Sequence, residues 1–399
     1  MKQSKHNIYY SPKEVRTILE RSIDTALDGL KGYCNDPVSD FTRCRKLPAR
    51  TLIECIMSFS NYSSIGELSH FFVGHGEMPS ASALSQRRQL LDPDIFKRIN
   101  NLFVSAFDDH TTINGYHILA QDGSDVNIPF MDDKTKTEKH DAKSFCQYHV
   151  NALYDCINKV FYDWSIDAAS KKREVNALIS ILKDRNYPQN SIFTADRGYE
   201  SYNLMAHFIE NDTKFVIRVK DIHTKSGLMT NIKTEEGAFD MRINRTLTSL
   251  QTKEIKADKE KYIFVPSTSN FDFLDENRDF YDLSFRAVRF KISEDTYETV
   301  VTNLSEEEFK TEDFKELYHY RWNEETAFNK LKYTIGLVYF HARKRKLIQQ
   351  EINAAFLMYN VSEVIIRNID LKKNKKPKLE YDYKPNFSSA VTNIRLYLR

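Results

Sequence analysis

The sequence predicts an α/β protein in which a mixed sheet follows a helical N-terminal region and is interrupted by a β-rich insertion. Up to about residue 110, apolar side chains recur at the three- and four-residue spacing of amphipathic helices. From residue 115, short apolar strands appear, first joined by a hairpin and then alternating with helices. A sheet built in this order is mixed rather than wholly parallel.

Four amphipathic helices are expected in the N-terminal region, over residues 11–30, 49–60, 64–72 and 93–107. Between them, residues 80–91 begin with a serine cap and carry Arg87 and Arg88 on a short helix. Arginines presented after a turn can enter a groove of DNA. An ordinary amphipathic surface helix explains this segment equally well.

The predicted sheet follows this helical region. We expect strands at residues 116–121, 146–154, 159–166, 191–195 and 214–220, with helices at 168–185 and 199–210. Residues 221–304 break the alternation, because four further strands follow with no helix between them. Helices resume over 311–335 and 346–369, and the apolar spacing of the second indicates core packing.

These elements divide the chain into five parts. They are a helical N-terminal domain expected to bind DNA (1–112), the first part of the core (113–220), the β-rich insertion (221–308), core helices (309–369) and a basic C-terminal tail (370–399).

Composition favours a folded protein in which a local basic region could contact a polyanion. Apolar residues make up 41% of the 399, and Gly and Pro are scarce at 11 and 10, which argues against disorder. A net charge of +2 excludes a uniformly basic surface, yet residues 313–399 hold 17 Lys and Arg against 9 Asp and Glu. For the lysine run at 372–378 alone, a solvated surface is the simpler explanation.

The expected compartment is the cytoplasm, where a DNA-acting protein would associate with the nucleoid. Five scattered cysteines without CxxC spacing fit a reducing environment. No segment resembles a signal peptide, and no window approaches 18 apolar residues, so no membrane contact is expected.

The most informative segment is residues 318–332, YHYRWNEETAFNKLK. At about 100° per residue on one helix, four of its side chains lie on one side: Tyr318, Arg321, Glu325 and Lys332. Buried charges are rare unless they are paired or bound to metal. This face is therefore suited to a site that holds a metal ion beside phosphates.

Two aspartates at predicted strand ends complete the candidate site. Asp122 follows the strand at 116–121 within DGS, and Asp196 follows the strand at 191–195 within DRGY. Strand ends are where α/β sheets hold ligands, and two carboxylates side by side repel each other unless a cation bridges them. With Glu325 the site has three oxygen ligands, which favour Mg²⁺ or Mn²⁺ over zinc. Two such ions can activate a water or a 3′-hydroxyl toward a phosphodiester.

These motifs give the chain its family resemblance. Over roughly 116–360 it resembles a DDE transposase of the insertion-sequence-4 family, whose signature is Tyr-x2-Arg-x3-Glu-x6-Lys. The resemblance implies a ribonuclease-H-like catalytic core with Asp122, Asp196 and Glu325 as catalytic metal ligands, two divalent ions, and a β insertion before the glutamate. It also implies hydrolysis at the element ends, strand transfer by the freed 3′-hydroxyl, an intermediate that is often a hairpin, and a homodimer bridging two ends of double-stranded DNA.

The same resemblance implies that the cationic side of the segment contacts DNA. The phosphate-binding candidates are Tyr318, Arg321, Lys332 and Arg197. Some relatives stack a flipped base on a tryptophan in the insertion, but here both tryptophans, Trp164 and Trp322, lie outside it. Insertion aromatics are the alternative platforms, namely Phe271, Phe273, Phe280 and Tyr281. We expect Trp322 to pack its helix against the sheet.

Two other functions stay open from the sequence. One is a metal-dependent DNA nuclease or domesticated relative that cuts without transposing. The other is a DNA-binding protein that keeps the fold without catalysis, and the intact acid triad argues against it. Other acids near the motifs are left out of the site because they lack a strand-end or helix-face position: Asp125, Asp132, Asp133 and Glu324.

Overall fold

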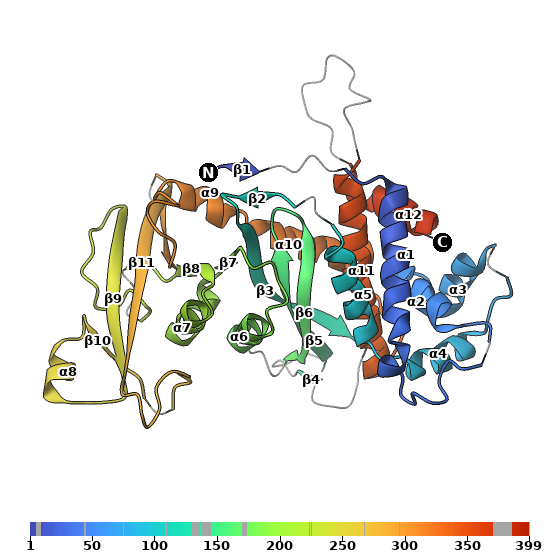
Figure 1. The fold of residues 1–399 in the computed structure, drawn as a ribbon, viewed down its shortest axis with the longest axis horizontal. Coiled ribbons are helices and arrows are strands. Elements are labelled where there is room, and N and C mark those ends of the chain that lie inside the picture. Colours follow the sequence, from blue (N-terminus) through green and yellow to red (C-terminus); the bar gives the residue numbers. More distant parts are fainter. Residues whose placement is uncertain are drawn as a thin grey trace, which may run out of the picture.

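A computed structural model gives the fold, and one large mixed sheet runs through it (Figure 1). The structure describes residues 1–4, 9–43, 45–74, 76–107, 110–129, 136–137, 145–169, 174–222, 224, 226–266, 268–294, 296–369 and 385–398. In Figure 1 the insertion strands lie at one end of the molecule, and the helices of the N-terminal region and the C-terminal helices lie at the other. The basic tail and the acids Asp132 and Asp133 fall largely outside the described residues.

The N-terminal region is helical, as predicted. Its helices are α1 (Pro12–Asp28), α2 (Ala49–Met57), α3 (Ser64–Phe72), α4 (Ala81–Leu90) and α5 (Asp94–Val104), with a short 3₁₀ turn η1 (Leu30–Tyr33). Ser11 starts α1 with a capping box, because its hydroxyl accepts from Glu14 N–H while the Glu14 carboxylate accepts from Ser11 N–H. A separate two-stranded sheet pairs β1 (Gln3–Ser4), near the N-terminus, with β2 (Thr112–Ile113).

Neither arginine of α4 projects freely from the surface. Arg88 is buried, and its guanidinium donates to Glu351 Oε1 at 2.7 Å and to the Leu347 carbonyl at 2.7 Å. Arg87 is half-buried over the Phe41 ring, 4.1 Å from its centroid. The groove-binding interpretation is therefore wrong for Arg88, because a buried guanidinium needs its carboxylate partner.

Five strands form the centre of the sheet in the order β6-β5-β3-β7-β8. Strand β5 runs antiparallel to both β3 and β6, whereas β3, β7 and β8 run parallel. The bounds are β3 (His117–Ile128), β5 (Phe145–Asp155), β6 (Val160–Ala168), β7 (Ser191–Ala195) and β8 (Lys214–Val219), with β4 (Lys136–Thr137) beside β5 and helices α6 (Glu174–Asp184) and α7 (Tyr202–Glu210) between strands.

Strand β3 is longer than predicted, and Asp122 lies within it rather than at its end. The parallel pairing of β3 with β7 stops at Ala120, while its antiparallel pairing with β5 continues to Ile128. Asp122 therefore lies just beyond the point where β7 leaves β3. The sequence pattern could not show this, because the antiparallel partner that extends β3 comes later in the chain.

The insertion continues the same sheet. Strand β12 pairs antiparallel with β8, with Thr299 opposite Val219, and the order continues through β11 and β9 to β10. The elements are β9 (Phe239–Thr248), α8 (Lys253–Ala257), β10 (Tyr262–Phe264), β11 (Phe280–Ser293) and β12 (Thr296–Thr302). The four strands were predicted, but the expectation of no helix was wrong, because Thr252 caps the short helix α8.

The helix predicted over 311–335 is broken into three pieces. They are α9 (Asp313–His319), α10 (Trp322–Asn329) and the π-helix η4 (Lys330–Ile335). Gly336, at a φ of 105°, then ends η4 in the left-handed conformation that glycine adopts without strain. A single helical wheel over 318–332 is thus only approximate, because a π turn changes the angle between successive side chains.

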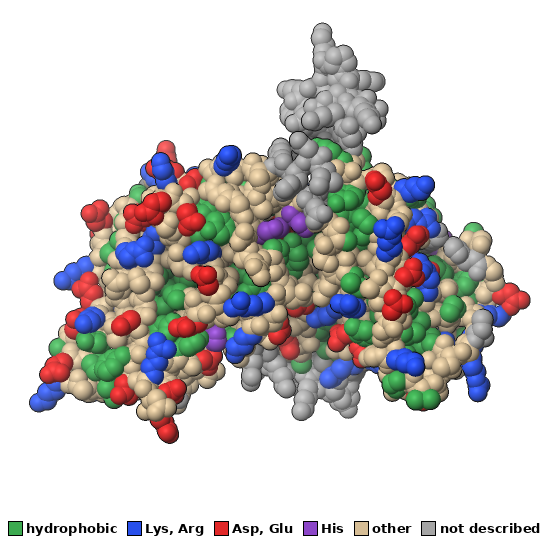
Figure 2. Space-filling view, in the orientation of Figure 1, with side chains coloured by type: hydrophobic (Ala, Val, Ile, Leu, Met, Phe, Trp, Pro, Cys, Tyr) green, Lys and Arg blue, Asp and Glu red, His purple; other side chains and the backbone are tan. Residues whose placement is uncertain are grey.

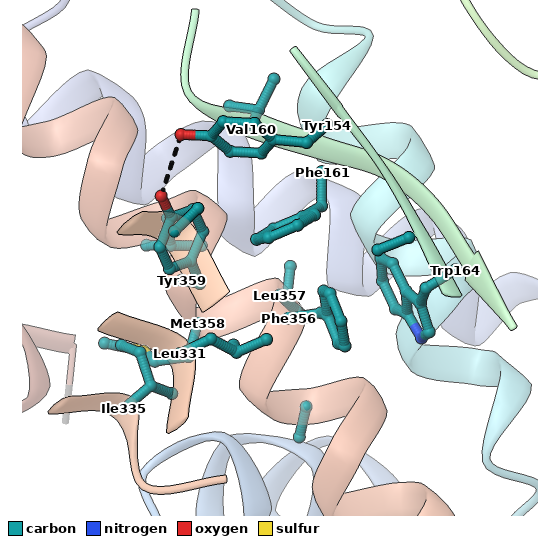
Figure 3. Close-up of a cluster of buried hydrophobic side chains, with 14 of the residues drawn as sticks. Tyr154, Val160, Phe161, Trp164, Leu331, Ile335, Phe356, Leu357, Met358 and Tyr359 are labelled. Carbon is teal, nitrogen blue, oxygen red and sulfur yellow. Dashed lines mark hydrogen bonds between the residues drawn. The ribbon is translucent and has the colours of Figure 1, made fainter. Parts of the chain in front are cut away.

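The long helix α11 (Arg345–Arg367) packs against the sheet and the N-terminal helices, and α12 (Phe387–Leu398) lies beside it (Figure 1). Figure 3 shows the contact with the sheet: the Trp164 ring stacks on Phe356 at 4.4 Å, and the Tyr154 and Tyr359 hydroxyls are 3.2 Å apart. The predicted core role of this helix is confirmed, since Phe356 and Tyr359 are fully buried.

Charges of both signs are interspersed on the face shown in Figure 2, which agrees with the small net charge of +2. Among the described residues, no helix combines the length and apolar character needed to cross a bilayer.

Candidate active site

Asp122 stands in a crowded acidic environment. Its Oδ1 accepts from the Gly123 N–H at 2.8 Å, and its Oδ2 lies 3.5 Å from Arg321 Nη1. Burial raises the pKa of the Asp122 carboxyl, and the negative charges of Asp196 and Glu174 add to this rise. The Gly123 N–H and Arg321 act in the opposite direction but do not outweigh it. The site therefore favours added positive charge.

Asp196 lies on the neighbouring strand. It directly follows β7, as predicted, and its Oδ1 caps the 3₁₀ turn η3 (Arg197–Tyr199) by accepting from Gly198 N–H at 2.7 Å. Because β3 and β7 are adjacent and parallel, both aspartates lie where this strand pair ends on its carboxyl side. They are close enough for the Asp196 charge to act on Asp122. The sequence pattern left open whether the two strands are neighbours, and the structure pairs them.

Arg321 joins Glu325 to Asp122. Its Nη2 donates to Glu325 Oε1 at 2.8 Å while Nη1 faces Asp122, so one guanidinium contacts two of the three predicted acids. The Arg321 side chain is only 4% exposed, against 42% for Glu325. Burial disfavours its charge, but Tyr318 and the two carboxylates outweigh burial and hold the pKa of Arg321 above its ordinary value.

Tyr318 and Lys332 lie deeper than exposed phosphate-binding side chains would. Tyr318 is buried, burial raises its pKa to about 12, and its hydroxyl has no hydrogen-bond partner among the described residues. Lys332 is half-buried, and its Nζ donates to the Asp125 carbonyl at 2.8 Å, which ties η4 to β3. Arg197 is exposed beside Asp196.

The aromatic candidates divide by exposure. Trp322 is 48% exposed, with the Arg321 guanidinium 5.6 Å from its ring centroid, so the expectation that it packs against the sheet is wrong. In the insertion, Tyr281 is buried against Phe271 and Phe273 and presents no open face, whereas Phe280 is exposed.

Two carboxylates that the sequence interpretation left out or overlooked belong to this cluster. Glu324 is fully buried, faces the Asp122 backbone N–H without a hydrogen bond of ordinary geometry, and burial holds its pKa well above the usual range. Glu174 opens α6 and acts on Asp122. Glu324 had a local signal, since it adjoins Glu325. Glu174 had none, because only the sheet order brings α6 to this edge.

The chemical types of these residues suit a divalent cation, although their donor atoms are not already arranged around one ion position. Within the described part of the chain, no three His, Cys, Asp or Glu side chains form a metal-binding group. The donors are carboxylate oxygens, which Mg²⁺ and Mn²⁺ prefer. Buried side-chain polar atoms of three residues near them lack a hydrogen bond of ordinary geometry to any described residue, namely those of Gln121, Tyr199 and Glu324. Arg321 supplies positive charge between Asp122 and Glu325.

Crowded carboxylates and a buried arginine, here beside the carboxyl end of β7, are groups that metal-dependent phosphodiester chemistry uses. Comparison with protein families matches residues 113–361 to the family described as "Transposase DDE domain". This match spans more than half of the chain, so the protein belongs to that family and is a DNA transposase of the DDE class. Divalent metal ions are in general used by this class.

Comparison with curated proteins gives no match. Among solved structures, a piggyBac transposase synaptic complex with hairpin DNA, determined by cryo-EM, is similar at 12% sequence identity and a TM-score of 0.49, covering 100% of this chain and 82% of that chain.

Proposed function

We propose that this transposase moves an insertion sequence of the insertion-sequence-4 family by cut-and-paste transposition. The supporting observation is the connected group of Asp122, Arg321 and Glu325, with Asp196 on the adjacent strand. These residues come from β3, α10 and the end of β7, and they are the acids and the arginine of the motif.

A ribonuclease-H-like core is part of this proposal. The support is the order β6-β5-β3-β7-β8, with β5 antiparallel to both its neighbours and β3, β7 and β8 parallel. The first acid lies on the central strand β3, the second follows the adjacent strand β7, and the third comes from a later helix.

Asp122, Asp196 and Glu325 would hold two Mg²⁺ or Mn²⁺ ions. Bound there, the ions would activate the attacking water or 3′-hydroxyl and stabilise the leaving oxygen. Arg321 is held beside these acids by its contacts with Asp122 and Glu325. Metal ions bound by the two carboxylates would free its fork to pair bidentately with a DNA phosphate. Tyr318, Lys332 and the exposed Arg197 complete the proposed phosphate-binding set.

The proposed partners are the terminal inverted repeats and target DNA, held by a homodimer. The helical residues 1–112 are proposed to bind DNA, through surfaces other than the buried Arg88. The proposed route releases the flanking strand through a hairpin. Trp322, which is exposed near the acids, is the proposed platform for a flipped base.

A strand-transfer assay tests this function. Purified protein is incubated with Mg²⁺, labelled DNA carrying the inverted repeats that flank the gene, and a target plasmid. We expect nicked ends, a hairpin on denaturing gels and joined product, all lost in Asp122→Asn, Asp196→Asn and Glu325→Gln. Cleavage without joined product would favour the nuclease or domesticated alternative. Unchanged cleavage by Asp122→Asn would show that the active site is elsewhere.

A further inference from the structure

The Glu174 carboxylate faces two glycines, one directly after Asp122 and the other two residues after Asp196. A Cβ atom added to Gly123 would lie 2.9 Å from Glu174 Oε1, and one added to Gly198 would lie 3.9 Å from Glu174 Oε2. Gly123 follows Asp122, and Gly198 donates its N–H to Asp196. One carboxylate therefore faces the backbone beside both aspartates.

A buried histidine holds Glu174 in this position. His149 Nε2 lies 3.1 Å from Glu174 Oε1, and His149 Nδ1 lies 2.8 Å from Asp125 Oδ1. His149 is on β5 directly opposite Asp125 on β3, so the strand register sets the imidazole between the two acids. Burial lowers the pKa of His149, but the two carboxylates outweigh burial and raise it. The imidazole between the two carboxylates orients Glu174.

Besides its ion pair with His149, the Glu174 carboxylate also acts on Asp122. Its charge adds to that of Asp196 on Asp122, which is unfavourable unless a cation is shared. Beside it, the Tyr199 side chain is fully buried and subject to the charges of Glu174, Asp122 and Glu324. The Tyr199 hydroxyl lacks a hydrogen bond of ordinary geometry to any described residue. A buried hydroxyl among acids that lacks such a bond to the described residues points to a ligand that is not protein.

We propose that Glu174 is a fourth carboxylate ligand of the divalent-ion site, with His149 as its positioning residue. This inference rests on the proposed function, because it adds to the set of Asp122, Asp196 and Glu325. Mg²⁺ and Mn²⁺ take about six oxygen ligands in octahedral geometry, so three carboxylates shared between two ions leave room for a fourth. The Glu174 side chain is partly open, at 32% exposure, so an ion can reach it.

Mn²⁺ binding to the DNA-free protein tests the proposal without relying on activity. Free Mn²⁺ is followed by electron paramagnetic resonance during titration of the wild type, Glu174→Gln and a control, Asp184→Asn, at the exposed far end of the same helix α6. We expect Glu174→Gln to bind Mn²⁺ about 10-fold or more weakly. His149→Gln should show a smaller loss in the same direction, and Asp184→Asn should match the wild type.

The outcomes separate this inference from the proposed function. Wild-type Mn²⁺ affinity in Glu174→Gln, together with loss of binding in Asp122→Asn, would overturn the role of Glu174 and leave the three-acid site standing. Unchanged binding in Asp122→Asn would overturn the proposed site itself. Far-UV circular dichroism checks folding, and if Glu174→Gln does not fold, Glu174→Asp takes its place. This shorter acid should fold and still bind Mn²⁺ more weakly, and wild-type affinity would again overturn the role.

Discussion

A buried histidine between two glutamates should make the stability of this protein depend on pH. His341 lies between η4 and α11, with its Nε2 3.2 Å from Glu67 Oε1 of α3 and its Nδ1 3.4 Å from Glu351 Oε2 of α11. All three side chains are nearly inaccessible to solvent. Removing the imidazole by His341→Gln leaves two buried carboxylates without this cation.

The magnitude follows from the pKa of His341. Burial lowers this pKa, but the two glutamates outweigh burial and raise it from 6.5 to about 9. At about 1.4 kcal/mol per pH unit, the protonated imidazole contributes about 3 kcal/mol to the free energy of unfolding. Because the folded-state pKa is raised, the contribution is complete below pH 6.5 and is lost as the pH rises through about 9.

The two glutamates set the acidic limit of the same network. Hydrogen bonds and the charge of His341 outweigh burial and lower the pKa values of Glu67 and Glu351 below 4.5. Their contribution is therefore present above pH 4.5 and is lost as the pH falls through the folded-state values. The network as a whole is strongest between pH 4.5 and 6.5.

Urea unfolding followed by far-UV circular dichroism measures the effect at several pH values. The difference between the wild type and His341→Gln should be about 3 kcal/mol at pH 6.5, about 1.4 kcal/mol at pH 8 and near zero at pH 9.5. His319→Gln, an exposed histidine at the end of α9, serves as the control and should follow the wild type throughout. A difference that is the same at pH 6.5 and pH 9.5 would refute the reasoning.

Two further predictions concern packing. Gly123→Ala would place a Cβ atom 2.6 Å from His149 Cε1, so we expect a loss of about 1–3 kcal/mol in urea unfolding. Gly32→Ala has nothing within 4 Å of the added atom and is the matched control. Equal stability of the two variants would contradict the close packing of His149. Phe356→Ala removes the ring stacked on Trp164 and should cost about 3–5 kcal/mol, measured by tryptophan fluorescence in urea. A loss below about 1 kcal/mol would contradict this core contact.

Local pattern was sufficient for most elements and for Asp196. The N-terminal helices have apolar spacing that their own residues supply, and Asp196 follows a short apolar strand that ends where predicted. Asp122 was placed at a strand end, but pairing with β5 carries β3 through it. The helix over 311–335 was predicted as one piece, and its break and π turn were missed. Apolar periodicity reports burial and not the continuity of backbone hydrogen bonds.

The sequence by itself predicted which residues form the candidate site, because acids and cations at fixed spacing on one helix, and aspartates after apolar strands, are local features. The tertiary structure alone decided which of them meet. Sheet order brings β3 beside β7, and the register of β5 sets His149 opposite Asp125. Glu174 reaches the aspartates only because α6 packs at that edge. Such contacts join residues far apart in the chain, so no local pattern encodes them.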